Sequence, residues 1–445
     1  MQHKKRNESG QVLVIMAVAM VGLIGFLALA IDGGTIFSDR RYDQNAADAS
    51  AMAGALAAAQ VFEDSTNLVR YESFNCSSPS TGLSNAISQA SAKAIARAAD
   101  NNFTIAGDLS TQHGVTVTCT EQNMGGYFDK YLDVTVMIST DVETSFAHLF
   151  YPGPIRNTVQ AVARVRPRTP AVFGNALVAL KDNPNCDQPP KDMTMVFDGG
   201  VDLTITGSGF YTNACLDSQN ATIVTTTGKN SYVVDWVEPN QNKIVVKPAD
   251  VSAVIPGPDI PPVDCAALKA ANNYGDFVSN NPSDVFNLSP GYYNSFTVSK
   301  GTVTLSKGIY CIKGDVTMSG GTITGDDMMF YLEEGGFTTT ANAVVDIKAL
   351  REDNTDVNEQ DWTGILIYQV NPAEDLILIG NSLSTYNGTV FAPKSNCEIG
   401  GNTSAHALDV QIICYTIKNH GSTIMNIVYS GSKTYTSPAY IDFYR

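Results

Sequence analysis

Three pairs of adjacent acids are the residues whose type and spacing could do chemistry. They are Asp326-Asp327, Glu333-Glu334 and Glu352-Asp353. Two carboxylates about 5–10 Å apart across a groove could hydrolyse a glycosidic bond. Acids converging from several loops could bind calcium, which takes about six to eight oxygen ligands. Acid pairs occur more often as solvated turn residues, and a dipeptide is weak evidence for a site. We therefore predict no catalytic residue, no metal site and no cofactor.

The remaining reactive side chains are scattered. Four histidines are isolated in the sequence: His113, His148, His406 and His420. Trp236 and Trp362 could stack on sugars, although core packing is the more common use of tryptophan. The chain has no G-x-S-x-G, Walker or dinucleotide-binding motif. We expect a protein that is not an enzyme, with a polysaccharide-active or carbohydrate-binding protein as the alternative.

The eight cysteines lack any C-x-x-C pair, which argues against a zinc site. An even number of cysteines in an exported chain is typical of disulfides. Sequence does not determine the connectivity, and the simplest pairing joins sequence neighbours. That pairing is Cys76–Cys119, Cys186–Cys215, Cys265–Cys311 and Cys397–Cys414.

The charge balance excludes nucleic acid as a partner. The chain has 28 basic and 44 acidic residues and a net charge of −16, so phosphates would repel it. Its one basic cluster is Lys4-Lys5-Arg6. Charged residues make up only 16% of the chain, and glycine, threonine, serine and asparagine are abundant, as in β-rich extracellular proteins.

Residues 11–31 form an uncharged apolar run that would extend about 30 Å as a helix, enough to cross a bilayer. Basic residues precede the run and Asp32 follows it, so residues 1–10 form a cytoplasmic tail and the rest is extracytoplasmic. The alternative is a cleaved signal, because Ala28-Leu29-Ala30 has the small-x-small pattern. The run is longer than a signal core, which favours a retained single-pass anchor.

The helical pattern continues through residues 32–62, which are rich in alanine. Alanine leaves a surface so small that another helix can approach closely. Gln44, Asn45 and Asp48 add polar groups to this surface. An ordinary helix within the protein's own domain is the alternative to a docking helix.

Residues 9–58 resemble the N-terminal module of the TadG-like proteins of tight-adherence (Flp-type) pilus systems. The matching positions are Gly10, Ala30-Ile31-Asp32-Gly33, Arg40-Arg41 and Gln44-Asn45-Ala46-Ala47-Asp48-Ala49. The resemblance implies a membrane-anchored, pseudopilin-like protein whose helix docks with other pilin-like subunits. A prepilin site has Glu five residues after its Gly, whereas this chain has Ile15 there. The metal-binding D-x-S-x-S loop of some TadG-like proteins does not occur in it.

Residues 63–168 are predicted to form a small α+β pilin-like domain. A helix is expected over residues 84–102, with Ser84 as N-cap and Asn101-Asn102 as its end. Alternating patterns predict strands over residues 115–119, 132–138 and 157–166. Prolines at 167 and 170 mark the domain boundary.

Residues 169–445 have a different pattern, with short Thr/Val/Ile runs separated by Gly, Asn and Asp and no helices between them. This pattern favours a right-handed parallel β-helix, with a β-sandwich as the alternative. "TVTLSKG" at 302 and "DVTMSGG" at 315 suggest degenerate repeats thirteen residues apart. We expect an insertion near residues 250–288, extended in its proline-dense part, and a terminal cap from residues 436–445. The β domain would serve assembly or adhesion, with surface polysaccharide as a candidate ligand.

Overall fold

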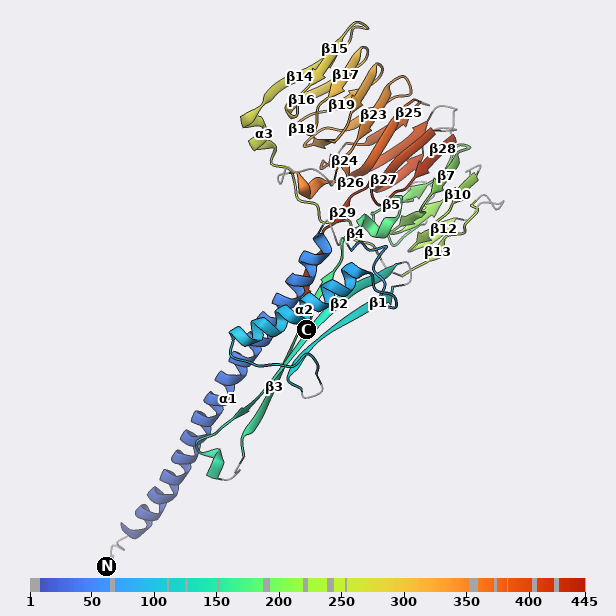
Figure 1. The fold of residues 1–445 in the computed structure, drawn as a ribbon. Helices are drawn as coiled ribbons and strands as arrows, with labels where there is room; N and C mark the ends of the chain where they lie inside the picture. The colour runs from blue at the N-terminus through green and yellow to red at the C-terminus, as the bar shows by residue number, and fades with distance from the viewer. Residues whose placement is uncertain are drawn as a thin grey trace, which may run out of the picture. The chain divides into compact units, whose positions relative to one another are not determined.

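The computed structural model describes residues 9–64, 69–109, 112–124, 127–149, 153–186, 193–218, 223–237, 244–252, 254–351, 359–371, 374–381, 383–401, 406–419 and 424–444. The chain forms two compact units, which Figure 1 shows. Unit 1 comprises Met1–Gln122, Asp129–Arg168 and Pro438–Arg445. Unit 2 comprises Asn123–Phe128 and Thr169–Ser437.

Helix α1 of unit 1, Ser9–Glu63, is a single helix of 55 residues. At 1.5 Å per residue it is about 80 Å long. The apolar run and the alanine-rich run therefore belong to one helix, with no break at Gly33 or Gly34. In its first part the large apolar side chains from Val12 to Leu29 are 58–74% exposed, whereas the alanine-rich part buries one side.

Helix α2, Thr81–Asp100, starts earlier than its sequence pattern predicts. The Oγ of Ser80 accepts a hydrogen bond from the N–H of Leu83, so Ser80 is the N-cap and the expected Ser84 cap is wrong. Leu83 is fully buried, and its packing extends the helix through Gly82. Asn101 is the C-cap, as expected, and Asn102 has a positive φ of 65°.

The sheet of unit 1 has the order β1-β2-β3-β30. Its strands are β1 Gly114–Asn123, β2 Phe128–Val142, β3 Ile155–Arg166 and β30 Tyr440–Phe443. Strands β2 and β3 form an antiparallel hairpin from Leu132↔Val165 to Val142↔Ile155, with the one-turn helix η1, Ala147–Leu149, in its connection. The three predicted strands are confirmed, and β1 and β2 are longer than predicted.

The sequence pattern did not predict strand β30. Residues 436–445 were expected to cap the β-helix, and this prediction is wrong. Tyr440–Phe443 pairs antiparallel with β3 of unit 1 instead. Its Asp442 bonds Arg166 at 2.7 Å, and Arg166 also makes a two-pronged contact with Asp129 of β2 at 2.8 and 2.9 Å. Opposite charges on adjacent strands select this pairing.

Unit 2 is a β-solenoid of about nine turns, which confirms the parallel β-helix and excludes the sandwich. Its strands stack in parallel on three faces. Face 1 comprises β13 Ala249–Asp250, β11 Ser231–Tyr232, β8 Phe210–Thr212, β5 Leu177–Ala179, the middle of β27 His406–Asn419 and of β26 Thr385–Gly401, β24 Ile365–Gln369, β21 Met328–Leu332, β18 Gly308–Ile312 and the start of β16 Gly291–Val298.

The other two faces complete each turn. Face 2 comprises β12 Asp235–Val237, β9 Cys215–Asp217, β6 Met195–Val196, the ends of β27 and β26, β25 Leu376–Gly380, β22 Phe337–Thr339, β19 Val316–Met318 and the end of β16. Face 3 comprises β10 Ile223–Thr226, β7 Asp202–Thr206, β28 Ile424–Val428, the starts of β27 and β26, β23 Val344–Lys348, β20 Thr322–Gly325, β17 Thr302–Leu305 and β15 Val285–Leu288.

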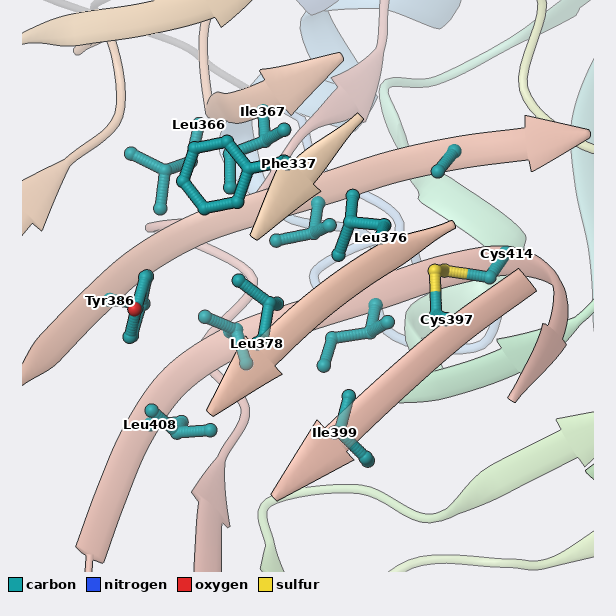
Figure 2. Packing of buried hydrophobic residues seen from close by; sticks show 14 of the residues in the cluster. Phe337, Leu366, Ile367, Leu376, Leu378, Tyr386, Cys397, Ile399, Leu408 and Cys414 are labelled. Atoms are coloured by element: carbon teal, nitrogen blue, oxygen red, sulfur yellow. A yellow bond between two sulfur atoms is a disulfide. The ribbon is translucent and has the colours of Figure 1, made fainter. Parts of the chain in front are cut away.

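Strand alternation builds the core of the solenoid. In β17, Val303 and Leu305 point inward and are buried, while Thr302 and Thr304 are exposed. Strands of all three faces add such side chains to one continuous core, and Figure 2 shows part of it around Phe337, Leu376 and Tyr386. Apolar burial in this core is the main stabilising contribution.

The structure corrects the predicted repeat. Thr302 pairs with Thr322, so adjacent turns are 20 residues apart here rather than thirteen. The segments at 302 and 315 lie on different faces, in β17 and β19. The two segments look alike because strands with one side in the core and the other in solvent share the same alternation of apolar and polar residues.

The order of turns along the solenoid differs from the order of the sequence. The turn containing β5, β6 and β7 stacks in parallel on β27 and β28, which lie more than 200 residues later. In Figure 1 the red strands β26 to β28 lie between the orange strands and the green strands β5 and β7. The chain thus starts near the middle of the solenoid, builds one end, and then starts again at the other end.

A strap of residues 251–264 connects the two ends and covers the outer side of face 1. Its described residues, 251, 252 and 254–264, have no regular secondary structure, as the prolines predict. Ile255 and Ile260 pack in one cluster with Tyr211, Tyr331 and Tyr368 of face 1. This cover explains why the strands of face 1 are buried on both sides.

The predicted insertion near residues 250–288 is therefore too long. Only the strap and α3, Cys265–Ala271, lie outside the strands. Strand β14, Asn273–Ser279, pairs with β16, and β15 pairs with β17, so both belong to the solenoid. A two-residue antiparallel pair of β4 Thr169–Pro170 and β29 Thr436–Ser437 brings together the first and last segments of unit 2.

All four disulfides join sequence neighbours, as expected. They are Cys76–Cys119 in unit 1 and Cys186–Cys215, Cys265–Cys311 and Cys397–Cys414 in unit 2. Cys265 at the start of α3 joins Cys311 of β18, and Cys397 joins Cys414 on the adjacent strand (Figure 2). These links agree with an exported protein.

Candidate functional site

The candidate site is the part of α1 that follows its apolar run. The run itself has a mean hydropathy of 2.9 over its most apolar window and none of that window is buried in the protein. Such a surface is unstable in water, and its length and exposure suit a bilayer. Asp32 is the first charged residue after it.

Asp32 fixes the tip of the β2–β3 hairpin to α1. Its carboxylate accepts hydrogen bonds from the backbone N–H groups of Ser145 at 2.8 Å, Phe146 at 3.0 Å and Ala147 at 2.5 Å. These are the N–H groups at the start of η1, which have no partner within so short a helix. Asp32 is buried by this contact, although it lies next to the apolar run.

The hydrogen bonds also stabilise the charge of Asp32. Burial alone raises the pKa of this carboxyl, but the N–H donors of Ala147, Ser145 and Phe146 outweigh it and hold the pKa below its ordinary value. The group is thus a carboxylate at neutral pH, which is the form that can accept all these bonds.

Asp43 is a second buried acid on α1, and the sequence reasoning missed it. Its Oδ2 accepts hydrogen bonds from Thr140 Oγ1 at 2.5 Å and from Asn157 Nδ2 at 2.7 Å. Asp32 and Asp43 are eleven positions apart, which is three helical turns, so both point to the hairpin. The eleven-residue spacing of the two acids is the feature of the sequence that could have identified Asp43.

The alanine stripe of α1 packs within unit 1. The buried alanines of α1 and α2 belong to the core of unit 1, and α2 contributes Ala86, Ala90, Ala94 and Ala98. Gly54 lies at the closest approach, because a Cβ there would come within 2.7 Å of the carbonyl oxygen of Ala90 and 2.9 Å of Val134. The small residues therefore serve this chain's own helix pair, as in the alternative reading of the pattern.

The polar residues of the family motif divide into two groups. Gln44 donates to Asp48 at 2.8 Å and to the carbonyl of Gln160 on β3 at 3.2 Å, so both side chains are used internally. Arg40, Arg41 and Asn45 are exposed on the helix.

The two motif glycines stand apart from these contacts. A Cβ on Gly33 would meet nothing within 4 Å, so packing does not require glycine there. Gly10 lies in the first turn of α1.

Among the described acids of these pairs, Asp326, Asp327 and Glu334 lie next to basic groups, whereas Glu333 lies beside the hydroxyl of Tyr292. Asp327 has a positive φ of 62° in a turn, and it accepts bonds from Lys307 Nζ and the N–H of Arg351, both at 2.8 Å. Its neighbour Asp326 pairs with the side chain of Arg351. Glu334 is 3.9 Å from Lys313, whereas Glu352 and Asp353 lie outside the described residues.

The other candidates also have structural surroundings. Nδ1 of His113 accepts from the N–H of Ser139 at 3.0 Å. Trp236 donates to Ser218 at 3.0 Å and Trp362 donates to the strap carbonyl of Pro261 at 2.7 Å. His148 is exposed in η1, His406 lies in β27, and His420 lies outside the described residues. Among the described residues, no three His, Cys, Asp or Glu side chains gather as metal ligands do.

One cavity of about 400 Å³ opens on the side of the solenoid. Its lining includes three basic residues, Lys348, Arg351 and Lys433. Lys433 pairs with Asp409 at 2.6 Å, and Arg351 pairs with Asp326, so these two charges are balanced locally.

Fold and site together define a class of protein in which a long, exposed apolar helix carries a small α+β unit and a disulfide-linked parallel β-solenoid. Residues 10–60 match the family model of the Flp pilus-assembly TadE/G-like proteins, so the N-terminal module is similar to that domain. The match covers α1 and leaves the rest of the chain unassigned. No curated protein and no solved structure matches the chain.

Proposed function

We propose that the protein is a membrane-anchored, pseudopilin-like component of a tight-adherence (Flp-type) pilus system, and that it is not an enzyme. It displays the β-solenoid outside the membrane for assembly or adhesion. The observation that carries the proposal is the TadE/G-like match over residues 10–60, on a helix whose first part is apolar and exposed.

The proposed orientation places the N-terminus in the cytoplasm. Lys4, Lys5 and Arg6 precede the apolar run, and basic residues remain on the cytoplasmic side. The part of unit 1 after the apolar run and all of unit 2 then lie outside, where disulfides form and persist. The four disulfides of the two units support this orientation.

The proposed contact with other pilin-like subunits uses the exposed face of α1. Because Gln44, Asp48 and the alanine stripe are engaged within unit 1, the motif side chains that stay exposed for a partner are Arg40, Arg41 and Asn45. Charged groups at the rim of an interface steer association and select partners.

The test is co-purification of pilus components with the full chain from native membranes. We expect Arg40→Glu, Arg41→Glu and Asn45→Leu together to reduce it strongly. The matched control is Lys93→Glu with Arg97→Glu, two exposed cations on α2. Equal recovery from the triple variant and the control would contradict the docking role of this face.

A second candidate is a protein that binds or cleaves acidic polysaccharide, and the cavity lined by Lys348, Arg351 and Lys433 favours it. Lys348 would attract a uronate carboxylate. The full chain should then bind acidic polysaccharide, with weaker binding in Lys348→Ala, and a screen with and without calcium separates binding from cleavage. No binding to any acidic polysaccharide would exclude this candidate.

A further inference from the structure

We propose that the tip of the β2–β3 hairpin, centred on Phe146 and His148, lies in the lipid headgroup region beside α1. Unit 1 would thus contact the membrane twice, through the apolar helix and through this tip. The inference rests on the membrane anchoring proposed above for α1.

The first step is the level at which the tip is held. Asp32 directly follows the apolar run, and α1 continues through it without a break. Its carboxylate is within hydrogen-bond distance of three consecutive backbone N–H groups, those of Ser145, Phe146 and Ala147. If residues 11–31 cross the bilayer, the tip is therefore level with its surface.

The second step is backbone satisfaction. A loop can approach hydrocarbon only if its N–H and C=O groups have internal partners, because lipid tails offer none. The carboxylate of Asp32 accepts hydrogen bonds from three backbone N–H groups of the tip at once. In open water those groups could bond to solvent, so such a contact is most useful where water is scarce.

The third step is the chemistry of the side chains. The tip has the sequence Phe146-Ala147-His148-Leu149, with an aromatic, an exposed imidazole and apolar neighbours. On α1, Phe37 is 71% exposed and follows Asp32 by five residues, about 8 Å along the helix. Exposed phenylalanine and leucine side chains insert at the boundary between headgroups and acyl chains, and the interfacial layer is about 5–8 Å thick on each side of the hydrocarbon.

The charges next to the tip are one balanced pair and one exposed acid, which remains in the hydrated headgroup layer. Asp141 of β2 lies directly opposite Arg156 of β3, so the hairpin has balanced charge where it leaves the interface. Opposite charges on paired strand positions attract. Glu143 is exposed and lies between this pair and the tip.

The experiment uses single-tryptophan versions of the full chain in phosphatidylcholine vesicles that contain lipids brominated near the carbonyl end of the acyl chains. Trp236 and Trp362 are replaced by Phe, and one reporter is introduced at a time. Phe146→Trp and His148→Trp report on the tip, and two positions are used so that one variant suffices if the other folds poorly. Ile24→Trp reports on the apolar run, and Leu56→Trp, 50% exposed and about 36 Å beyond Asp32 on α1, is the aqueous control.

We expect bromolipid to quench Ile24→Trp and the tip reporters and to leave Leu56→Trp unchanged. Quenching of Ile24→Trp alone, with both tip reporters behaving like Leu56→Trp, would overturn this inference and leave the anchoring intact. Absence of quenching at Ile24→Trp would overturn the anchoring itself, and this inference with it.

Discussion

At the scale of single residues, acids on α1 determine how unit 1 is built. Asp32 and Asp43 lie on one face of the helix. Asp32 binds the tip of the hairpin at Ser145 to Ala147. Asp43 binds Thr140 of β2 and Asn157 of β3. Both carboxylates accept hydrogen bonds from donors of the same unit. Their chemistry is positioning.

Asp32→Asn is the most direct test of this role. An amide offers one acceptor oxygen and no charge, so it cannot hold all three N–H groups, and we expect faster hydrogen exchange at Ser145, Phe146 and Ala147. Exchange is measured by mass spectrometry on both proteins at the same pH. Asp39→Asn, on the same helix, is the control.

The same contact predicts a pH dependence with a defined sign. Because the folded-state pKa of Asp32 is lowered, its contribution is fully present above the ordinary value of 3.8 and is lost as pH falls through the lower folded value. The difference in the free energy of unfolding between wild type and Asp32→Asn should therefore be largest at neutral pH and vanish in strong acid. A difference that persists there would show that the charge is not what holds the tip.

Gly54→Ala tests the close approach of α1 and α2. Alanine is the better helix former, yet its Cβ would clash with the backbone of Ala90, so we expect a loss of about 1–3 kcal/mol in the free energy of unfolding. Gly33→Ala, where the added Cβ meets nothing, should lose no stability. Denaturant unfolding followed by circular dichroism measures both, and equal values would refute the packing argument.

At the scale of elements, the strap of residues 251–264 explains a property of face 1 that strand pattern alone does not. Strands β18 and β21 are buried on both sides, as in a sheet covered by helices. Here an extended segment provides the cover. Asn213 holds it, since its side chain bonds both the N–H and the C=O of Ile255, at 2.9 and 2.8 Å.

Asn213→Ala should therefore loosen the strap. It leaves two buried backbone groups of Ile255 unpaired, at an expected cost of about 1–3 kcal/mol. Hydrogen exchange should rise at Ile255 and its neighbours in the strap. The exposed Asn294→Ala on β16 is the control, and unchanged exchange in the strap would disprove the role of Asn213.

At the scale of the whole molecule, each unit joins segments far apart in the sequence. Unit 1 closes with β30 and unit 2 closes where β5 meets β27. Gln411 of β27 is fully buried and donates to the carbonyls of Ala171 and Asn175, 240 and 236 residues earlier, both at 2.8 Å. Such contacts are costly in loop-closure entropy and form only when the rest of the solenoid is in place.

Gln411→Ala tests whether β5 and β27 stabilise each other. Removing the amide leaves two carbonyls without their donor, and we expect a loss of about 1–3 kcal/mol. Exchange should rise in both β5 and β27 despite their separation in sequence. Asn287→Ala, an exposed side chain on β15, should leave both unchanged, and a response confined to β27 would contradict the coupling.

Local patterns predicted a large part of this architecture. The apolar run, the alanine-rich helix, the alternating strands and the Gly-punctuated turns each reflect interactions within about twenty residues, and such patterns can be recognised directly. Neighbour pairing of the cysteines also succeeded, since the two cysteines of each pair are only 17 to 46 residues apart in the chain.

Contacts between distant segments could be decided only by the tertiary structure. The thirteen-residue repeat, the long insertion and the terminal cap failed because strands of different faces share one alternation, and pairing partners are chosen by burial and charge across the folded chain. For the same reason the motif residues Gln44 and Asp48 proved to be internal, while Arg40, Arg41 and Asn45 remain exposed. Sequence identified the helix and its class, and packing decided which of its faces a partner can reach.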